Sequence, residues 1–235
     1  ELTTSFDVPE VRRSDLAKTF LDIECLLSSQ KSKFAFEWFE SPESGLLEKA
    51  KAVLVCVGAY RSTSITTLGF DFSKTSVHPR LASLVKCAAD LNVSSLGVWC
   101  AALLSEDAVS ELDFMEGFKK NRPTQSVERV AFDLAKSFKI SLSPFHAIVK
   151  DAASLEKLSM AILFSHTDHI GQVIAKKAEN TLTLKTAFGD VFDVTCSIEI
   201  AAKEIVCLNL DEFRLAGAST SKRVLRSYLT FKSEW

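Results

Sequence analysis

Residues 81–118 read LASLVKCAADLNVSSLGVWCAALLSEDAVSELDFMEGF, the longest run of the chain in which apolar residues recur at helical spacing. The recurrence begins with Leu81, Leu84, Val85, Ala88 and Leu91. Residues spaced in this way lie on one face of a helix, with the polar residues between them on the other. We therefore predict an amphipathic helix that begins near Pro79, because the missing N–H of proline costs nothing in a first turn.

The centre of this run, residues 96–104 (LGVWCAALL), has no polar face. A helix that is apolar all round is buried, and this one is far shorter than the ~20 residues that a bilayer span needs. A third amphipathic helix is expected through Leu112 and Met115, after an N-cap at Ser105. Three helices with short links pack as antiparallel neighbours, so we expect Trp99 in the middle of the core.

Outward from this centre, apolar periodicity predicts mainly helices. They are expected at residues 14–27, 46–57, 127–138 and 154–166, and at the C-terminus over Leu225, Tyr228 and Leu229. Alternation predicts a short strand at 34–38 and a β-hairpin at 181–196, whereas residues 198–210 fit a strand or a helix equally well. The expected fold is mainly α with a minor α+β part, a two-lobed helical protein with a small antiparallel β-hairpin in its C-terminal half.

The clearest break in the pattern lies at residues 121–123, and it sets the predicted domain boundary. Residues 1–121 would form an N-terminal helical lobe. Residues 122–235 would form a C-terminal helical lobe that carries the hairpin and a basic C-terminal helix. At 235 residues the chain is long enough for either one large domain or two small ones.

Composition indicates a globular protein that neither crosses a membrane nor binds a cofactor. Apolar residues make up 47% of the chain, yet no run of them is long enough for a transmembrane helix, and the N-terminus lacks the apolar segment of a signal peptide. The six cysteines form no C-x-x-C pair and stand among apolar neighbours. This pattern favours reduced, buried thiols and a cytoplasmic protein over a disulfide framework.

The charges are unevenly distributed between the two halves. Residues 1–117 hold 11 Lys and Arg against 17 Asp and Glu, whereas residues 118–235 hold 17 against 13. Opposite charges would attract copies of the chain to one another, which suggests self-association. The alternative is that these charged side chains only lie on solvent-exposed faces and attract no partner.

Motifs for a specific reaction are absent. The sequence has no G-x-G-x-x-G or Walker A pattern. Cys196 has no histidine nearby in sequence to act as a base, and nothing in the sequence requires that folding bring His146 close to it. His166, Asp168 and His169 are the densest group of metal-ligand types, but a polar helix end accounts for them equally. We therefore predict no metal, no cofactor and no catalytic residue.

The C-terminal segment is more informative. Residues 213–233 contain five cations and no acid, with aromatic residues interleaved. Cations neutralise phosphates, and aromatic rings offer stacking surfaces for bases, so this mixture is typical of nucleic-acid binding. The predicted nucleic-acid-binding residues are Arg214, Lys222, Arg223, Arg226, Tyr228, Phe231 and Lys232, extended by Lys119, Lys120 and Arg122 if the lobes enclose a cleft. An amphipathic helix with solvated cations is the alternative.

Three functions remain open on these observations. The first is a non-enzymatic assembly protein that binds or coats nucleic acid, with single-stranded RNA favoured, as a viral nucleoprotein or coat protein does. The second is a protein-interaction or regulatory module that acts through the apolar helices at 46–57 and 96–104. The third is an enzyme whose polar pocket is gathered from distant segments.

Overall fold

A computed structural model describes residues 11, 15–29, 36–148, 151–178, 181–186, 189, 191–196, 204–214 and 221–231. The chain divides into two compact units, residues 1–80 and residues 81–235. This division differs from the predicted boundary at 121/122, since residues 121–124 form the short link between two helices of the second unit. Phe188 and Asp190, which lie between the two strands of the predicted hairpin, and residues 34 and 35 of the predicted short strand lie outside the described residues.

The first unit is a small helical bundle with one two-stranded sheet. It contains α1 (Ala17–Ser29), α2 (Ser44–Cys56), the antiparallel strands β1 (Tyr60–Arg61) and β2 (Ser64–Ile65), and α3 (Thr67–Ser73). Helix α1 buries Phe20 and Leu21, as its periodicity predicts, and the Phe20 ring meets that of Tyr60 edge to face. Residues 36–38 form no strand, so that part of the prediction was wrong.

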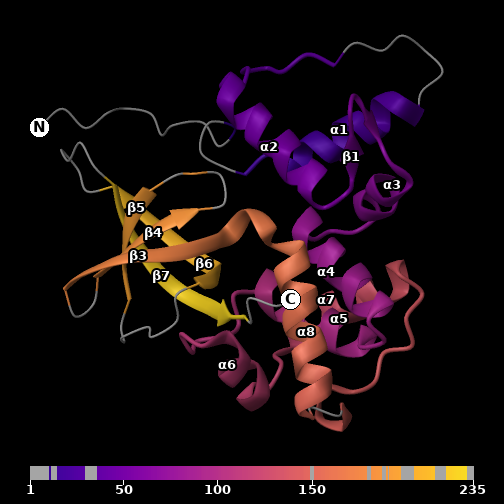
Figure 1. Cartoon of the computed structure of the whole chain (residues 1–235). Helices are drawn as coiled ribbons and strands as arrows, with labels where there is room; N and C mark the ends of the chain where they lie inside the picture. Colours follow the sequence, from indigo (N-terminus) through magenta and orange to yellow (C-terminus); the bar gives the residue numbers. More distant parts are fainter. Residues whose placement is uncertain are drawn as a thin grey trace, which may run out of the picture. The chain divides into compact units, whose positions relative to one another are not determined.

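Helices make up the first part of the second unit. Helix α4 (Pro79–Asp90) begins at the division between the units and is followed by α5 (Ser94–Ser105), α6 (Phe114–Lys120), α7 (Gln125–Ser137) and α8 (Ala152–Ser165). Figure 1 shows α5 in the middle of this group, in contact with α7 and α8. Residues Leu96–Leu103 of α5 are all buried, which confirms that its lack of a polar face marks a core helix.

The third predicted helix begins later than expected. Ser105 ends α5 instead of capping a new helix, and Asp107 adopts a positive φ of 47°. Asp113 is the N-cap of α6, because its carboxylate accepts hydrogen bonds from the backbone N–H groups of Met115 and Glu116. Residues 106–113 therefore form a connection, although Leu112 is still buried.

The rest of the second unit is a closed five-stranded barrel. Its strands are β3 (Ile170–Ala178), β4 (Thr181–Thr186), β5 (Val191–Thr195), β6 (Glu204–Arg214) and β7 (Ser221–Thr230), in the order β3-β4-β5-β7-β6. Every pair is antiparallel except β5 with β7, which is parallel. A five-stranded Greek-key barrel of this kind belongs to the OB-fold class.

The barrel contradicts the expected fold class of a two-lobed helical protein with one small hairpin. The β4–β5 hairpin is confirmed and residues 204–210 are strand, but the predicted C-terminal helix is strand β7. Ser227, Tyr228 and Leu229 are buried in succession, so β7 is covered on both faces at this point. Leu225, Tyr228 and Leu229 therefore have the i, i+3, i+4 spacing of a helical face although they lie on a strand.

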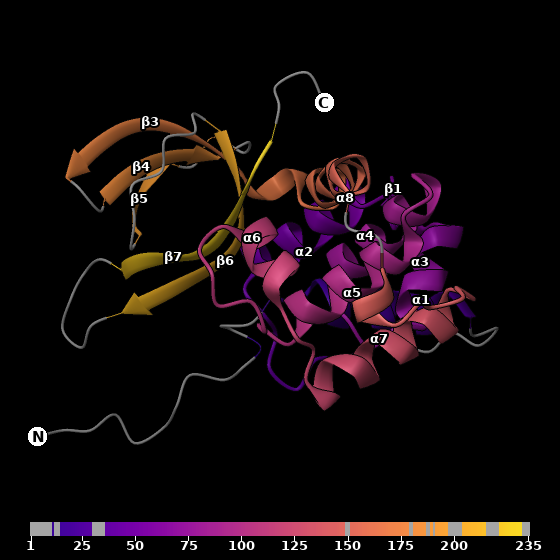
Figure 2. The same cartoon turned by 90° about the horizontal axis from the view of Figure 1, so that it is seen from below.

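Helices and barrel are joined within the second unit at two places. Helix α8 runs through the 3-10 turn Thr167–His169 directly into β3 (Figure 2). The backbone N–H of Tyr228 donates to the carbonyl of Leu112 at 2.9 Å, and Asp113 forms a parallel bridge with Tyr228. Leu112 consequently belongs to the barrel core, among Leu182, Leu184, Val194, Ile205 and Leu225.

The cysteine prediction holds for pairing and in part for burial. None of the six cysteines forms a disulfide, and Cys25, Cys100, Cys196 and Cys207 are buried, Cys87 is half-buried and Cys56 is exposed. Among the described residues, no helix combines the length and the hydropathy that a membrane crossing requires. The cytoplasmic location stays a prediction.

Candidate nucleic-acid interface

The predicted binding residues fall into two groups within the second unit. Arg214, Lys222, Arg223 and Arg226 belong to the β6–β7 hairpin, and we call them the hairpin cations. Lys119, Lys120 and Arg122 lie at the end of α6 and in the link to α7, beside a groove described below. The structure thus gathers the cations in two places, not on one continuous helix.

Three of the hairpin cations, Arg214, Lys222 and Arg223, lie close to the connection between β6 and β7, whereas Arg226 lies further along β7. In the backbone register Arg214 pairs with Ser221, Lys222 with Phe213, and Arg223 with Glu212. Figure 2 shows the ends of β6 and β7 that carry this connection pointing away from the helices of the same unit. Three cations therefore lie, by position in the chain, at the end of the hairpin that carries the connection, where Arg223 also pairs with Val194 of β5 and lies opposite Glu212.

The remaining C-terminal candidates differ in their surroundings. Arg226 is exposed on β7, between the buried residues Leu225 and Ser227. Tyr228 is 7% exposed and part of the barrel core, so its ring supports the barrel and is not available to stack on a base. Burial raises the pKa of the Tyr228 phenol, and nearby Asp113 and Cys196 act in the same direction. Phe231 is half-buried, and Lys232 lies outside the described residues.

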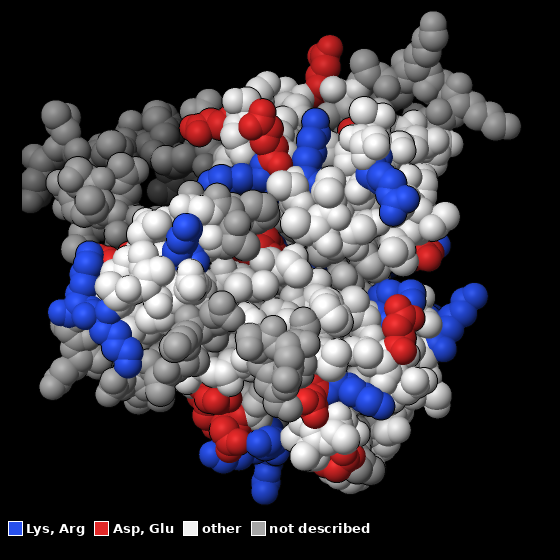
Figure 3. Space-filling view, in the orientation of Figure 1, with Lys and Arg blue, Asp and Glu red and all other residues white. Residues whose placement is uncertain are grey.

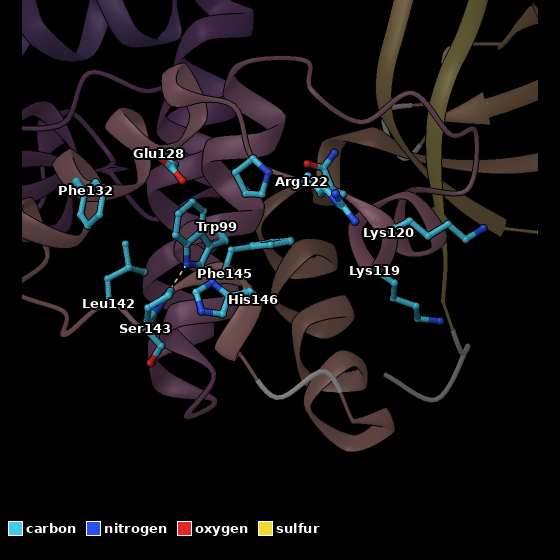
Figure 4. A pocket seen from close by; sticks show the side chains of 13 residues that line it. Trp99, Lys119, Lys120, Arg122, Glu128, Phe132, Leu142, Ser143, Phe145 and His146 are labelled. Carbon is cyan, nitrogen blue, oxygen red and sulfur yellow. Dashed lines mark hydrogen bonds between the residues drawn. The ribbon is translucent and has the colours of Figure 1, made fainter.

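A groove of about 700 Å³ opens on the helical part of the second unit. It is lined by Trp99, Lys119, Lys120, Asn121, Arg122, Pro123, Glu128, Phe132, Leu142, Ser143, Pro144, Phe145 and His146. Figure 4 shows Lys119 and Lys120 on the α6 side, directed away from Trp99, with Phe132 on the opposite side. The two lysines therefore border the groove on the α6 side without pointing toward its aromatic residues.

One wall of the groove is held in place by α5. The Trp99 indole N–H donates to the carbonyl of Ser143 at 2.9 Å, and the backbone N–H of Ser143 donates to Ser95 Oγ at 3.3 Å. The Phe145 ring packs edge to face against Trp99 and Phe118, with centroid distances of 5.5 and 5.6 Å. The segment around residues 142–146 is thus held by the buried rings of Trp99 and Phe118 and by the half-buried Ser95.

The other wall is fixed in a similar way. The Asn121 side-chain amide donates to the carbonyl of Ala108 at 2.7 Å. Thr124 caps α7 by accepting the backbone N–H of Val127, and Ser126 contacts Glu106. Two anchored segments therefore enclose the groove.

Charges at the groove are only partly neutralised. Lys119 and Lys120 both lie near Glu116, at 2.7 and 3.8 Å, and hydrogen bonding and charge from Lys119 hold the pKa of Glu116 below its usual value. Figure 3 shows basic and acidic side chains intermixed at the lower edge, where α6 lies in Figure 1. Among the described residues Arg122 takes part in no ion pair, and the same holds for Glu128.

The cluster of His166, Asp168 and His169 lies between α8 and β3. His166 ends α8 and is 4% exposed, with its Nδ1 atom 2.8 Å from Ser165 Oγ. His169 Nδ1 lies 2.8 Å from the carbonyl of Cys207 on β6, and Nε2 lies 3.7 Å from Asp168. Within the described part of the chain, no three His, Cys, Asp or Glu residues converge as metal ligands would. The cluster links α8 to the barrel.

The buried thiols are unsuited to nucleophilic chemistry. Burial raises the pKa of Cys207 to about 12 and also raises that of Cys100 well above its usual value. A thiol acts as a nucleophile in its ionised form, so both remain inert near neutral pH.

Sequence reasoning missed the aromatic part of the groove. Phe132 is 59% exposed, although α7 buries Val127, Ala131 and Leu134 on its other face. A large aromatic residue on the polar face of an amphipathic helix was the signal that could have drawn attention to it.

Neither a family model nor a curated protein matches the chain. Its structure resembles two solved structures of Escherichia coli HrpB, described as a DExH-box NTPase and as a DEAH/RHA helicase. The TM-scores are 0.72 and 0.68, at 18% and 16% sequence identity, over 99% and 97% of this chain. The likeness shows a shared fold. The chain spans only 27% of the length of HrpB.

Proposed function

We propose that the second unit binds single-stranded nucleic acid, with RNA as the favoured ligand. The observation that carries the proposal is the position of the hairpin cations: Arg214, Lys222 and Arg223 flank the β6–β7 connection of an OB-fold barrel. OB-folds bind oligonucleotides on one strand face and through loops that include the connection between their fourth and fifth strands, which is the β6–β7 connection here. Cations at this position favour contact with phosphates.

The fold comparison supports the same class of ligand. HrpB is described as a helicase, which is a class of protein that acts on nucleic-acid strands, and this chain shares the fold of about a quarter of it. We infer that the chain contributes strand binding, while strand separation or NTP hydrolysis would need other parts of such a protein. The fold lends no support to a viral coat, nucleoprotein or self-assembly role, and we do not propose one.

The alternative of a protein-interaction module is weakened by the burial of α5. The run at 96–104 was one of its two predicted contact surfaces, and the residues Leu96–Leu103 are all buried inside the second unit. The helix α2 still exposes Val55, but a single exposed apolar residue is ordinary for a protein surface.

Binding of a labelled single-stranded RNA tests the proposal. Fluorescence anisotropy with a strand of about 12 nucleotides, repeated over a range of salt concentrations, should show an affinity that falls steeply with salt. The double variant Lys222→Glu, Arg223→Glu should bind more weakly and reduce the slope of log K against log salt by roughly 1.4, about 0.7 for each lost phosphate contact.

The matched control is Lys49→Glu, Lys136→Glu, which changes the net charge by the same amount at exposed positions outside the barrel. Control and wild type should bind almost equally. Equal losses in the two double variants would show that only net charge matters, and absence of binding by the wild type would remove the proposal.

A further inference from the structure

The ring of Phe132 on α7 is exposed to solvent. Phe132 borders the groove and a second hollow of about 590 Å³ lined by Gln125, Ser126, Glu128, Arg129, Phe132 and Asp133. It takes part in no ring contact among the residues that the structure describes. A flat apolar surface between two hollows suits a planar ligand, because stacking covers the ring without any change in the fold.

The groove beside this ring is already formed. Trp99 and Phe145 are 3% and 8% exposed, so they build the floor and present little surface of their own. Hydrogen bonds from Trp99 and Asn121 hold the two facing segments in place. A preformed site loses little conformational entropy when a ligand enters it.

Polar groups at the groove are arranged around the ring. Glu128 lies one helical turn before Phe132, so both side chains project from the same face of α7. Arg122 lines the groove from the α6–α7 link, and Figure 4 shows it between the lysine side and the Trp99 side. An acceptor thus stands beside the ring, and a cation stands across the groove.

We propose that this groove holds one nucleotide of a bound single strand, with its base stacked on Phe132, its phosphate near Arg122 and its base edge near Glu128. The inference rests on the proposed function, because it assigns a second contact point to the same strand. It adds a base-reading site on the helical part of the second unit to the phosphate contacts proposed at the β6–β7 hairpin.

The charge of Glu128 predicts which bases fit. A carboxylate accepts hydrogen bonds, and cytosine, adenine and guanine each offer an amino group on the base edge. Uracil has no amino group, and its one N–H lies between two carbonyl oxygens that repel a carboxylate. The groove should therefore prefer bases with an amino group over uracil.

The test compares binding of oligo(C) and oligo(U) by the full chain. Phe132→Ala should weaken binding of oligo(C) at least about fivefold, because stacking on one aromatic ring is worth that much or more. The matched control is Phe164→Ala, a 45% exposed phenylalanine on α8 that does not line the groove, and it should stay near wild type.

A second variant tests the base reading. Wild type should bind oligo(C) at least about fivefold more tightly than oligo(U). Glu128→Gln should remove this preference, because an amide both donates and accepts, and it should leave the melting temperature unchanged because Glu128 is exposed.

The outcomes separate this inference from the proposed function. If Phe132→Ala and Phe164→Ala behave alike, or if oligo(U) binds as tightly as oligo(C), the groove proposal is wrong. The proposed function survives that result if Lys222→Glu, Arg223→Glu still weakens binding. If wild type binds neither strand, both proposals fail together.

Discussion

The Asp15 side chain contacts three other residues at the start of helix α1. Its Oδ1 atom accepts the backbone N–H of Ala17 at 2.8 Å, and Oδ2 lies 3.4 Å from His78 Nε2 and 3.3 Å from an Arg80 nitrogen. Burial alone would raise the pKa of Asp15. The hydrogen bond and charge of His78, the Ala17 N–H and the Arg80 guanidinium outweigh that effect and hold the pKa well below its usual range.

The first prediction concerns acid. Because the folded-state pKa of Asp15 lies below the unfolded value of about 3.9, its contribution is present above about pH 4 and is lost as pH falls further. Asp15→Asn should lower the free energy of unfolding at neutral pH by roughly 1 kcal/mol, a modest value because the side chain is 46% exposed. The difference from wild type should shrink at about pH 3.

Urea unfolding at both pH values measures this effect. Asp22→Asn is the control, since Asp22 is on the same helix, is 47% exposed and has an i,i+4 pair with Lys18. It should cost about 0.3–0.5 kcal/mol. An Asp15→Asn effect that is constant with pH would contradict the assigned ion pairs.

At the scale of elements, the contact between α4 and α5 depends on one glycine. A Cβ atom built on Gly97 would lie 2.2 Å from the Cβ of Ala88, far inside van der Waals contact. The two helices therefore approach each other at a point where only a hydrogen atom fits. Trp99, which lines the groove, lies two residues further along α5.

The second prediction follows from this packing. Gly97→Ala should destabilise the protein by about 1–3 kcal/mol, because overpacking exceeds the gain of about 1 kcal/mol in helix propensity. Gly45→Ala in α2 is the contrasting variant, since nothing lies within 4 Å of its added methyl group, and it should be neutral or slightly stabilising. Chemical denaturation of both variants gives the comparison, and effects of the same sign would count against the packing argument.

At the scale of the whole molecule, the chain comprises two compact units. The first contains α1 to α3, and the second contains the helices from α4 to α8 with the barrel. Cooperative unfolding requires a shared core, so units with their own cores tend to unfold in separate steps.

The third prediction is two unfolding steps. Hydrogen exchange followed by mass spectrometry at increasing urea concentration should show amides of α1 and α3 joining one exchange isotherm. Amides of α5, α7, α8 and β4 should join another, with a different midpoint. One common isotherm for all these helices would show that the chain unfolds as a single cooperative unit.

Much of the local structure could be predicted from the sequence. The periodicity of residues 81–104 and 127–138 predicted α4, α5 and α7, and alternation at 181–196 predicted the β4–β5 hairpin. In each case an element buries one face, or all faces, against neighbours that are near in the chain. The type and spacing of apolar residues then carry the necessary information.

The sequence by itself therefore determined the helical core around Trp99, the absence of disulfides among the six cysteines and the concentration of cations toward the C-terminus. Only the tertiary structure decided that the last segment is a strand, since the parallel pairing of Val194 with Arg223 closes a barrel across distant residues. It also decided the groove, where Trp99, Arg122, Phe132 and His146 come from separate segments. A hydrophobic pattern records that a residue is buried, but it does not record which distant segment covers it.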